Sequence, residues 1–287
     1  MRADITDIRH VMAIALRARR NLGYKLTDAF CIFDAAEKLE IETMFVEIPS
    51  MEGMYSRNKP PHILISSMRP RGRQSFTCAH EIGHHYLGSG AYIDETVLDE
   101  WPNPSTPEEF LADCFAGFFL MPKVTVEYAL KIRGWKAQSL QALQVYSIAC
   151  WMGVSYAALV NQMSRTLGIL SAYQAEKLAG IKLKQIKHSL LADSKDEDII
   201  IVDQNWINRP VDIRVGDFIF LPYGTRHEGK AIVTVAEEKI GLLVRGEVPG
   251  ISRAWLENNK WSSYIRVSRK GYSGLGKFRH LEEVKDE

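Results

Sequence analysis

The segment His80-Glu81-Ile82-Gly83-His84 constrains the fold of this chain most, because its chemistry requires a helix with a partly buried face. Residues four apart on a helix project from one face, so the imidazoles of His80 and His84 can bind one metal ion. Glu81 lies beside that face, where it can act as a general base on water. The flanking residues are mostly apolar, and buried polar groups need partners that a metal ion provides. The alternative is two exposed histidines on an ordinary helix.

A third metal ligand is expected from the helix predicted over residues 106–120, which begins with the N-cap signals Thr106 and Pro107. Glu109 and Asp113 are four apart and therefore share a face of this helix. We predict that Glu109 is the third ligand, because Zn²⁺ accepts two histidines and one carboxylate. Asp113 then accepts the free N–H of a ligand histidine. The alternative role of Glu109 is to complement the positive end of the helix dipole.

Periodicity along the first half of the chain predicts an α+β fold, in which helices are combined with a small antiparallel sheet. Residues 88–107, rich in Gly, Asp, Pro and Asn, are predicted to form a long surface loop. The predicted helices are residues 6–20, 27–39, 74–87 and 106–120, and the predicted strands are residues 42–48, 53–57 and 62–67.

The chain divides into three predicted parts: residues 1–135, a helical segment over 136–195, and a mostly-β domain over 196–287. An appended β domain is a natural place for a sensory or substrate-selecting role. Residues 139–168 have the pattern of a helix-turn-helix, but its second helix has only Arg165 as a basic residue. A nucleic-acid reader usually carries more Lys and Arg, so we favour a helical packing unit.

Composition limits the classes of function. The chain has 287 residues with a formal net charge of +1, so it has no overall basic field that would attract nucleic acid. None of its four cysteines forms a C-x-x-C pair. The first residues lack the apolar core of a signal peptide, and no apolar run approaches the roughly 20 residues that cross a bilayer. We therefore expect a cytoplasmic protein with no membrane partner.

The motif His80-Glu81-x-x-His84, followed by Glu109-x-x-Ala112-Asp113-x-Phe115-Ala116 and Leu120-Met121-Pro122, resembles the ImmA/IrrE metallopeptidase family. The resemblance covers roughly residues 10–170. It implies a zincin-like catalytic core with Zn²⁺ as its cofactor. It also implies a protein substrate, namely a helix-turn-helix repressor whose cleavage switches on phage, mobile-element or stress-response genes. Family members commonly carry Asn at position 113, where Asp is an equally good acceptor.

The strand predicted just before the motif helix is a candidate substrate-binding element. An extended peptide can pair with the edge of such a strand through its backbone. The alternative is an ordinary strand inside the sheet. The residues assigned to substrate binding are Ile63, Leu64, Ile65, Ser66 and Ser67.

Several side chains near the motif leave alternatives open. A thiolate from Cys78 or Cys114 could fill the open position of zinc and hold an enzyme latent, although free cysteines more often pack in the core. A group that stabilises the transition state could be any of three residues, among which the sequence does not choose. These three are Arg73, Tyr86 and Tyr92.

Two further functions stay open on the sequence alone. The chain could be a non-catalytic, metal-containing regulator that binds a repressor or nucleic acid, or a toxin–antitoxin partner. Glu81 separates an enzyme from the regulator, because a purely structural zinc site has no use for a base and closes its fourth position with protein. A small-molecule or nucleic-acid activator is a further expected partner.

Overall fold

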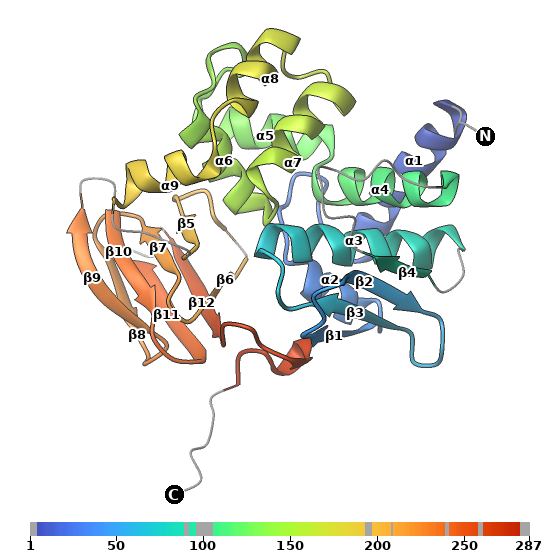
Figure 1. Ribbon diagram of the computed structural model, residues 1–287. Helices are drawn as coiled ribbons and strands as arrows, with labels where there is room; N and C mark the ends of the chain where they lie inside the picture. The colour runs from blue at the N-terminus through green and yellow to red at the C-terminus, as the bar shows by residue number, and fades with distance from the viewer. Residues whose placement is uncertain are drawn as a thin grey trace, which may run out of the picture.

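The computed structural model describes residues 5–88, 92–95, 106–192, 197–207, 209–238, 241–257 and 261–281 (Figure 1). Its N-terminal part contains helices on one face of a sheet. Helix α3 (Arg71–Leu87) lies on the sheet, and α4 (Pro107–Leu120) packs on α3. Helices α1 (Ile5–Asn21) and α2 (Ile32–Lys38) flank this pair, α1 against α4 and α2 against α3. The chain is thus α+β, as predicted. Most of the predicted loop over residues 88–107 lies outside the described residues.

The N-terminal sheet is mixed, which corrects the prediction of a small antiparallel sheet. Its strand order is β13-β1-β3-β2-β4. Strands β1 and β3 run parallel, with Glu42 opposite His62, whereas the other neighbours are antiparallel. The strand bounds are β1 (Glu42–Val46), β2 (Met51–Ser56), β3 (His62–Ser66), β4 (Tyr92–Glu95) and β13 (Gly274–Leu275).

Strand β13 comes from the C-terminal end of the chain, so the N-terminal sheet is completed by a segment more than 200 residues away in sequence. Leu275 pairs with Met44 and Gly274 with Phe45, and the Ser273 hydroxyl donates to the Phe45 carbonyl. Figure 1 shows this red segment returning to β1 after leaving the C-terminal sheets. The three-part division of the chain remains a prediction, and β13 crosses it.

The middle of the chain is helical. Helices α6 and α7 form the predicted helix-turn-helix-like unit and bend by 104° at their junction. Most of their side chains are buried, including Trp151 and Leu159, which favours the packing interpretation. No single helix among the described residues is long and apolar enough to cross a membrane, although the bent pair passes that test together. The bounds are α5 (Lys123–Arg133), η1 (Ala137–Ser139), α6 (Ala142–Met152), α7 (Tyr156–Asn161), the π-helical η2 (Gln162–Thr166), α8 (Ala172–Ala179) and α9 (Leu183–Leu190).

Two four-stranded sheets form the C-terminal part, with strand orders β5-β7-β10-β9 and β6-β12-β11-β8. Alternating burial along β12 places Ser263, Ile265 and Val267 inside and Tyr264 outside. The strands are β5 (Ile199–Ile201), β6 (Val211–Arg214), β7 (Phe218–Leu221), β8 (Thr225–Glu228), β9 (Ile232–Glu238), β10 (Gly241–Gly246), β11 (Gly250–Leu256) and β12 (Ser262–Ser268), and a short 3₁₀ turn η4 (Gly276–Phe278) follows β13. Residues 193–196 of the predicted acidic linker lie outside the described part.

One apolar core extends through all three parts, from Val11 and Ile82 through Trp151 to Trp206 and Ile265. Polar contacts cross the same boundaries. The Tyr146 hydroxyl of α6 donates to the Ile199 carbonyl of β5, and Arg133 pairs with Asp203 at 2.7 Å. The C-terminal sheets are therefore packed onto the helices rather than tethered beside them.

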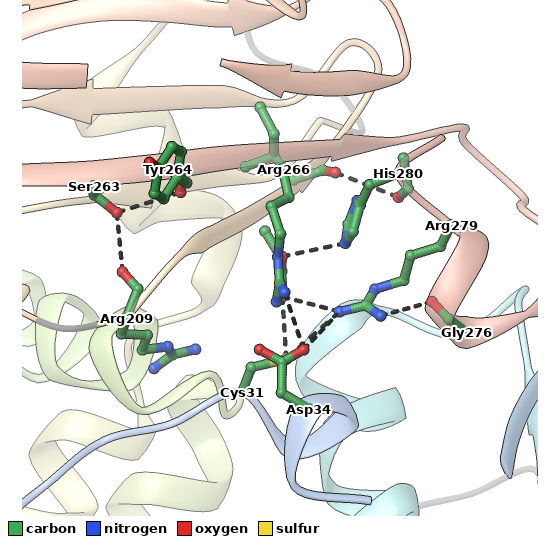
Figure 2. Close-up of polar contacts among 12 residues, drawn as sticks. Cys31, Asp34, Arg209, Ser263, Tyr264, Arg266, Gly276, Arg279 and His280 are labelled. Carbon is green, nitrogen blue, oxygen red and sulfur yellow. Dashed lines mark hydrogen bonds and ion pairs between the residues drawn. The ribbon is translucent and has the colours of Figure 1, made fainter. Parts of the chain in front are cut away.

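A cluster of charged side chains joins α2 to the C-terminal sheet (Figure 2). This carboxylate–guanidinium cluster consists of Asp34, Asp212, Arg266 and Arg279. Arg266 Nη2 lies 2.8 Å from Asp212 Oδ2, and Arg279 Nη2 lies 3.5 Å from the same oxygen. Burial alone would raise the pKa of Asp212, but Arg279 and Arg266 hold it well below its usual range.

Candidate metal centre

Helix α3 carries the motif and ends where the sequence predicts. Gly88 follows it in the left-handed conformation, with φ of 83°, and donates to the His84 carbonyl. The helix lies between the sheet and α4, so its motif side chains are withdrawn from solvent. His80 is 6% exposed, and Glu81 and His84 are 1% exposed. Three polar groups in such a place require partners.

Helix α4 supplies one of these partners because it approaches α3 closely. Thr106 caps α4 by accepting from the Glu109 N–H at 3.3 Å, which fixes its first turn. A Cβ added at Gly83 would lie 3.2 Å from the Cα of Ala112. Small residues on both helices therefore permit the contact that brings Glu109 to the histidines.

The structure brings His80, His84 and Glu109 together, with their ligand atoms all within 4.8 Å of one another. The His80 and His84 Nε2 atoms are 3.0 Å apart. Glu109 Oε2 lies 3.0 Å from His80 Nε2, and Oε1 lies 3.4 Å from His84 Nε2. Ligand atoms at the zinc distances of about 2.0–2.1 Å would be separated by about 3.3 Å in a tetrahedron. The donor set and its spacing thus fit one tetrahedral metal ion.

Asp113 lies one helical turn after Glu109 and contacts the other nitrogen of His80. Its Oδ1 is 2.9 Å from His80 Nδ1. A carboxylate there accepts the Nδ1–H and leaves the Nε2 lone pair directed at the metal position. This is the contact that the sequence predicts for Asp113.

The electrostatics of the centre favour a cation. Burial lowers the pKa of His80, but hydrogen bonds to Asp113 and Glu109 outweigh it and raise the value to about 10. Hydrogen bonds from His80 and His84 in turn lower the pKa of Glu109. Both shifts have one cause, which is that three carboxylates surround the buried imidazoles. The protons that these shifts retain stand where a metal ion would supply the positive charge.

Glu81 is held between α3 and the neighbouring strand β2. A Cβ added at Gly53 of β2 would lie 2.8 Å from Glu81 Oε1 and would also overlap Thr77. Glu81 is close enough to His80 for its charge to raise the pKa of that imidazole. The absence of a side chain at Gly53, which sequence reasoning missed, therefore leaves the space that Glu81 occupies.

The predicted substrate-binding strand is wrong in one respect, because β3 has no free edge. Its residues pair with β1 on one side and β2 on the other. Ile63 and Ile65 are fully buried, and the Ser67 N–H donates to the Val46 carbonyl. Residues 63–67 are therefore an inner part of the sheet, and a peptide cannot extend the sheet along them.

The other residues singled out near the motif have partners away from the donor group. Arg73 pairs with Glu52 at 3.0 Å, and the Tyr86 ring stacks on Phe115 with 5.5 Å between centroids. The side chain of Tyr92 lies outside the described residues. The Tyr55 hydroxyl contacts His85 Nδ1 at 2.7 Å, a pair that no sequence pattern indicates.

Neither cysteine near the motif belongs to the His–His–Glu group. Cys78 is fully buried, and burial raises the pKa of its thiol well above the usual range. Burial also raises the pKa of Cys114 to about 11. Both groups are therefore held as thiols in this structure, and they pack in the core as free cysteines commonly do.

Comparison with known families agrees with this geometry. A buried histidine pair and a glutamate from a second helix are typical of metallopeptidases of the H-E-x-x-H class. Residues 36–164 match the family model described as the IrrE N-terminal-like domain, Peptidase_M78. This part of the chain, which contains α3, α4 and the whole donor group, belongs to the ImmA/IrrE family of metallopeptidases, as the motif resemblance predicted. A comparison with curated proteins gives no match.

Proposed function

We propose that this protein is a zinc-dependent endopeptidase in which His80, His84 and Glu109 hold Zn²⁺. The observation that carries the proposal is the separation of 3.0–3.4 Å among their ligand atoms. Two imidazoles and one carboxylate leave a fourth position for water or substrate, which is the composition of catalytic rather than structural zinc sites.

The chain's own residues supply the proton transfers. Zinc, when bound, supplies a Lewis acid that polarises the scissile carbonyl and acidifies water. Glu81 accepts the proton of the attacking water and delivers it to the departing amine as the peptide bond breaks. Asp113 keeps His80 in the tautomer that presents Nε2 to the metal. Burial of α3 against the sheet and α4 limits access of bulk water to these groups.

We further propose that the substrate is a protein, namely a helix-turn-helix repressor, and that its cleavage in the cytoplasm derepresses phage, mobile-element or stress-response genes. Membership of residues 36–164 in the IrrE N-terminal-like family supports this choice. The C-terminal sheets would select the substrate or gate the enzyme, because they pack directly onto the helices that follow the metal centre.

Metal content measured by mass spectrometry tests the ligand assignment. The wild type and Glu81→Gln are expected to carry about one zinc per chain, since Glu81 is not a ligand, and Glu109→Ala is expected to lose most of it. Glu108→Ala is the matched control, because Glu108 precedes Glu109 on α4 but is exposed. Its zinc content should equal that of the wild type.

The outcome decides between the enzyme and the regulator. If zinc follows the expected pattern, Glu81→Gln becomes an inert protein with an intact site, suited to capturing the uncleaved substrate. A wild type without zinc, or a Glu109→Ala protein that keeps it fully, would overturn the assignment and favour a non-catalytic regulator that binds a repressor.

A further inference from the structure

A cavity of about 110 Å³ lies where the N-terminal turn of α3, helix α6 and the C-terminal sheets meet. Arg71 and Gly72 line it from α3, and Arg209 and Trp206 line it from the segment between β5 and β6. We call it the Arg71–Arg209 cavity. It is separate from the metal centre, whose donor residues do not line it.

Three buried N–H groups around this cavity have no hydrogen-bond partner among the described residues. They are Arg71 Nη1, Arg209 Nε and Trp206 Nε1. Trp206 is only 2% exposed. A buried donor without an acceptor costs about 1–3 kcal/mol, and more when it is charged. Three such donors on one cavity indicate that acceptor atoms belong inside it.

The charge around the cavity is positive once the existing ion pairs are counted. Asp198 lines the cavity but is paired with Lys187 at 2.7 Å and with Arg214 at 3.0 Å. Asp212 also lines it and is bound by Arg266 and Arg279. Neither carboxylate therefore offers a free charge to the cavity.

The two arginines of the cavity form no ion pair within the described part of the chain. Arg209 donates to the Trp151 carbonyl and stacks on the Trp206 ring at 5.0 Å. Burial lowers the pKa of Arg209, and the charge of Arg71 lowers it further, although Asp212 and Asp34 partly offset this. Two guanidinium groups thus face the same low-dielectric space, a situation that a bound anion relieves.

The walls between these donors are apolar. Phe30, Phe33, Met152 and Ile200 contribute to the lining. The first turn of α3 adds the positive end of a 17-residue helix. Cavities of roughly 150 Å³ admit a benzene ring, so this one has the scale of a single small ring or a short chain.

We propose that the Arg71–Arg209 cavity is a binding site for a small anion, a carboxylate or phosphate group carried on a small apolar body. The anionic oxygens accept from Arg71, Arg209 and Trp206, and the body packs on the aromatic walls. Because α3 is continuous from Arg71 to Leu87, this ligand contacts the same helix that carries His80 and His84.

Isothermal titration of the full chain tests the site directly and requires no peptidase activity. The probes are benzoate, inorganic phosphate and benzamide, the last being a neutral match in shape to benzoate. Binding of benzoate or phosphate is expected, with benzamide at least about tenfold weaker than benzoate. Benzoate binding without phosphate binding identifies an organic acid site, and the reverse identifies a phosphate site.

Variants then locate the binding. Arg71→Met and Trp206→Phe are expected to weaken the anion at least about tenfold, since each removes a donor and keeps an apolar side chain. Arg165→Met is the matched control, because Arg165 is exposed, and it should bind like the wild type. The proposal fails if neither anion binds at millimolar concentration, if benzamide binds as well as benzoate, or if Arg71→Met retains wild-type affinity.

Discussion

Asp34 in α2 and Arg266 in β12 form an ion pair with 3.0 Å between Oδ1 and Nη1, although 232 positions separate them in the sequence (Figure 2). Arg279 reaches the same Asp34 oxygen at 3.5 Å. Since α2 packs on α3, this pair and the rest of the carboxylate–guanidinium cluster connect the C-terminal sheet to the helix of the metal centre. The stability of the whole chain should therefore depend on the cluster.

Removing the buried charge at the centre of this cluster tests that dependence. Asp212→Asn is expected to lower the free energy of unfolding by about 3–5 kcal/mol, because Arg266 and Arg279 then stay partly buried without their carboxylate. Urea unfolding followed by circular dichroism measures the change. Glu247→Gln, which breaks the exposed pair with Arg245, is the control and should change stability by less than about 1 kcal/mol. Equal effects of the two substitutions would contradict the prediction.

His280 should make the protein sensitive to mild acid. Burial lowers the pKa of His280 to about 3, whereas the unfolded chain binds this proton near pH 6.5. As pH falls below 6.5 the unfolded state gains a proton that the folded state does not, so stability decreases until about pH 3. The slope is at most about 1.4 kcal/mol per pH unit.

Urea unfolding at pH 7.0 and 5.0 measures this loss. His280→Gln should reduce the difference between the two pH values by about 1–2 kcal/mol. His10→Gln changes an exposed histidine on α1 and should leave the difference as in the wild type. The same pH dependence in all three proteins would show that His280 is not the group responsible.

Asp113 should matter for metal affinity through its acceptor oxygen rather than its charge. Asp113→Ala is expected to weaken zinc binding by about 10–100-fold, because His80 loses the contact that orients its ring. Asp113→Asn retains a carbonyl oxygen that can accept the Nδ1–H and should keep most of the affinity. Competition with a chromogenic chelator measures both, and an Asn variant as weak as the Ala variant would assign the effect to charge.

Gly53 should affect catalysis without affecting metal content. Gly53→Ala places a methyl group against Thr77 and Glu81, so Glu81 must move while the three ligands stay. A displacement of about 1 Å can lower the rate of a chemical step by about 100-fold. We expect kcat for the identified substrate to fall by about 10–100-fold with zinc unchanged. Gly180→Ala, where the added Cβ meets only ordinary contacts, should retain full activity.

The donor residues were predictable from sequence because helix periodicity is a local property. Four-residue spacing places His80 and His84 on one face whatever the rest of the chain does, and the same spacing relates Glu109 to Asp113. Apolar flanks and cap residues defined both helices. The small residues Gly83 and Ala112 further allowed the helices to approach, so the α+β class and the chemistry of the centre followed from patterns within short segments.

Tertiary structure alone decided which distant segments meet. Alternating apolar residues indicate a strand but not its neighbours, so the parallel pairing of β1 with β3 and the return of β13 to β1 depended on how the whole chain closes. The same pairing buried β3 and removed its edge. Arg71, Arg209 and Trp206 likewise share a cavity only because the C-terminal sheets pack on α3 and α6. Contacts between residues far apart in sequence leave no local period, and for that reason only the folded chain reveals them.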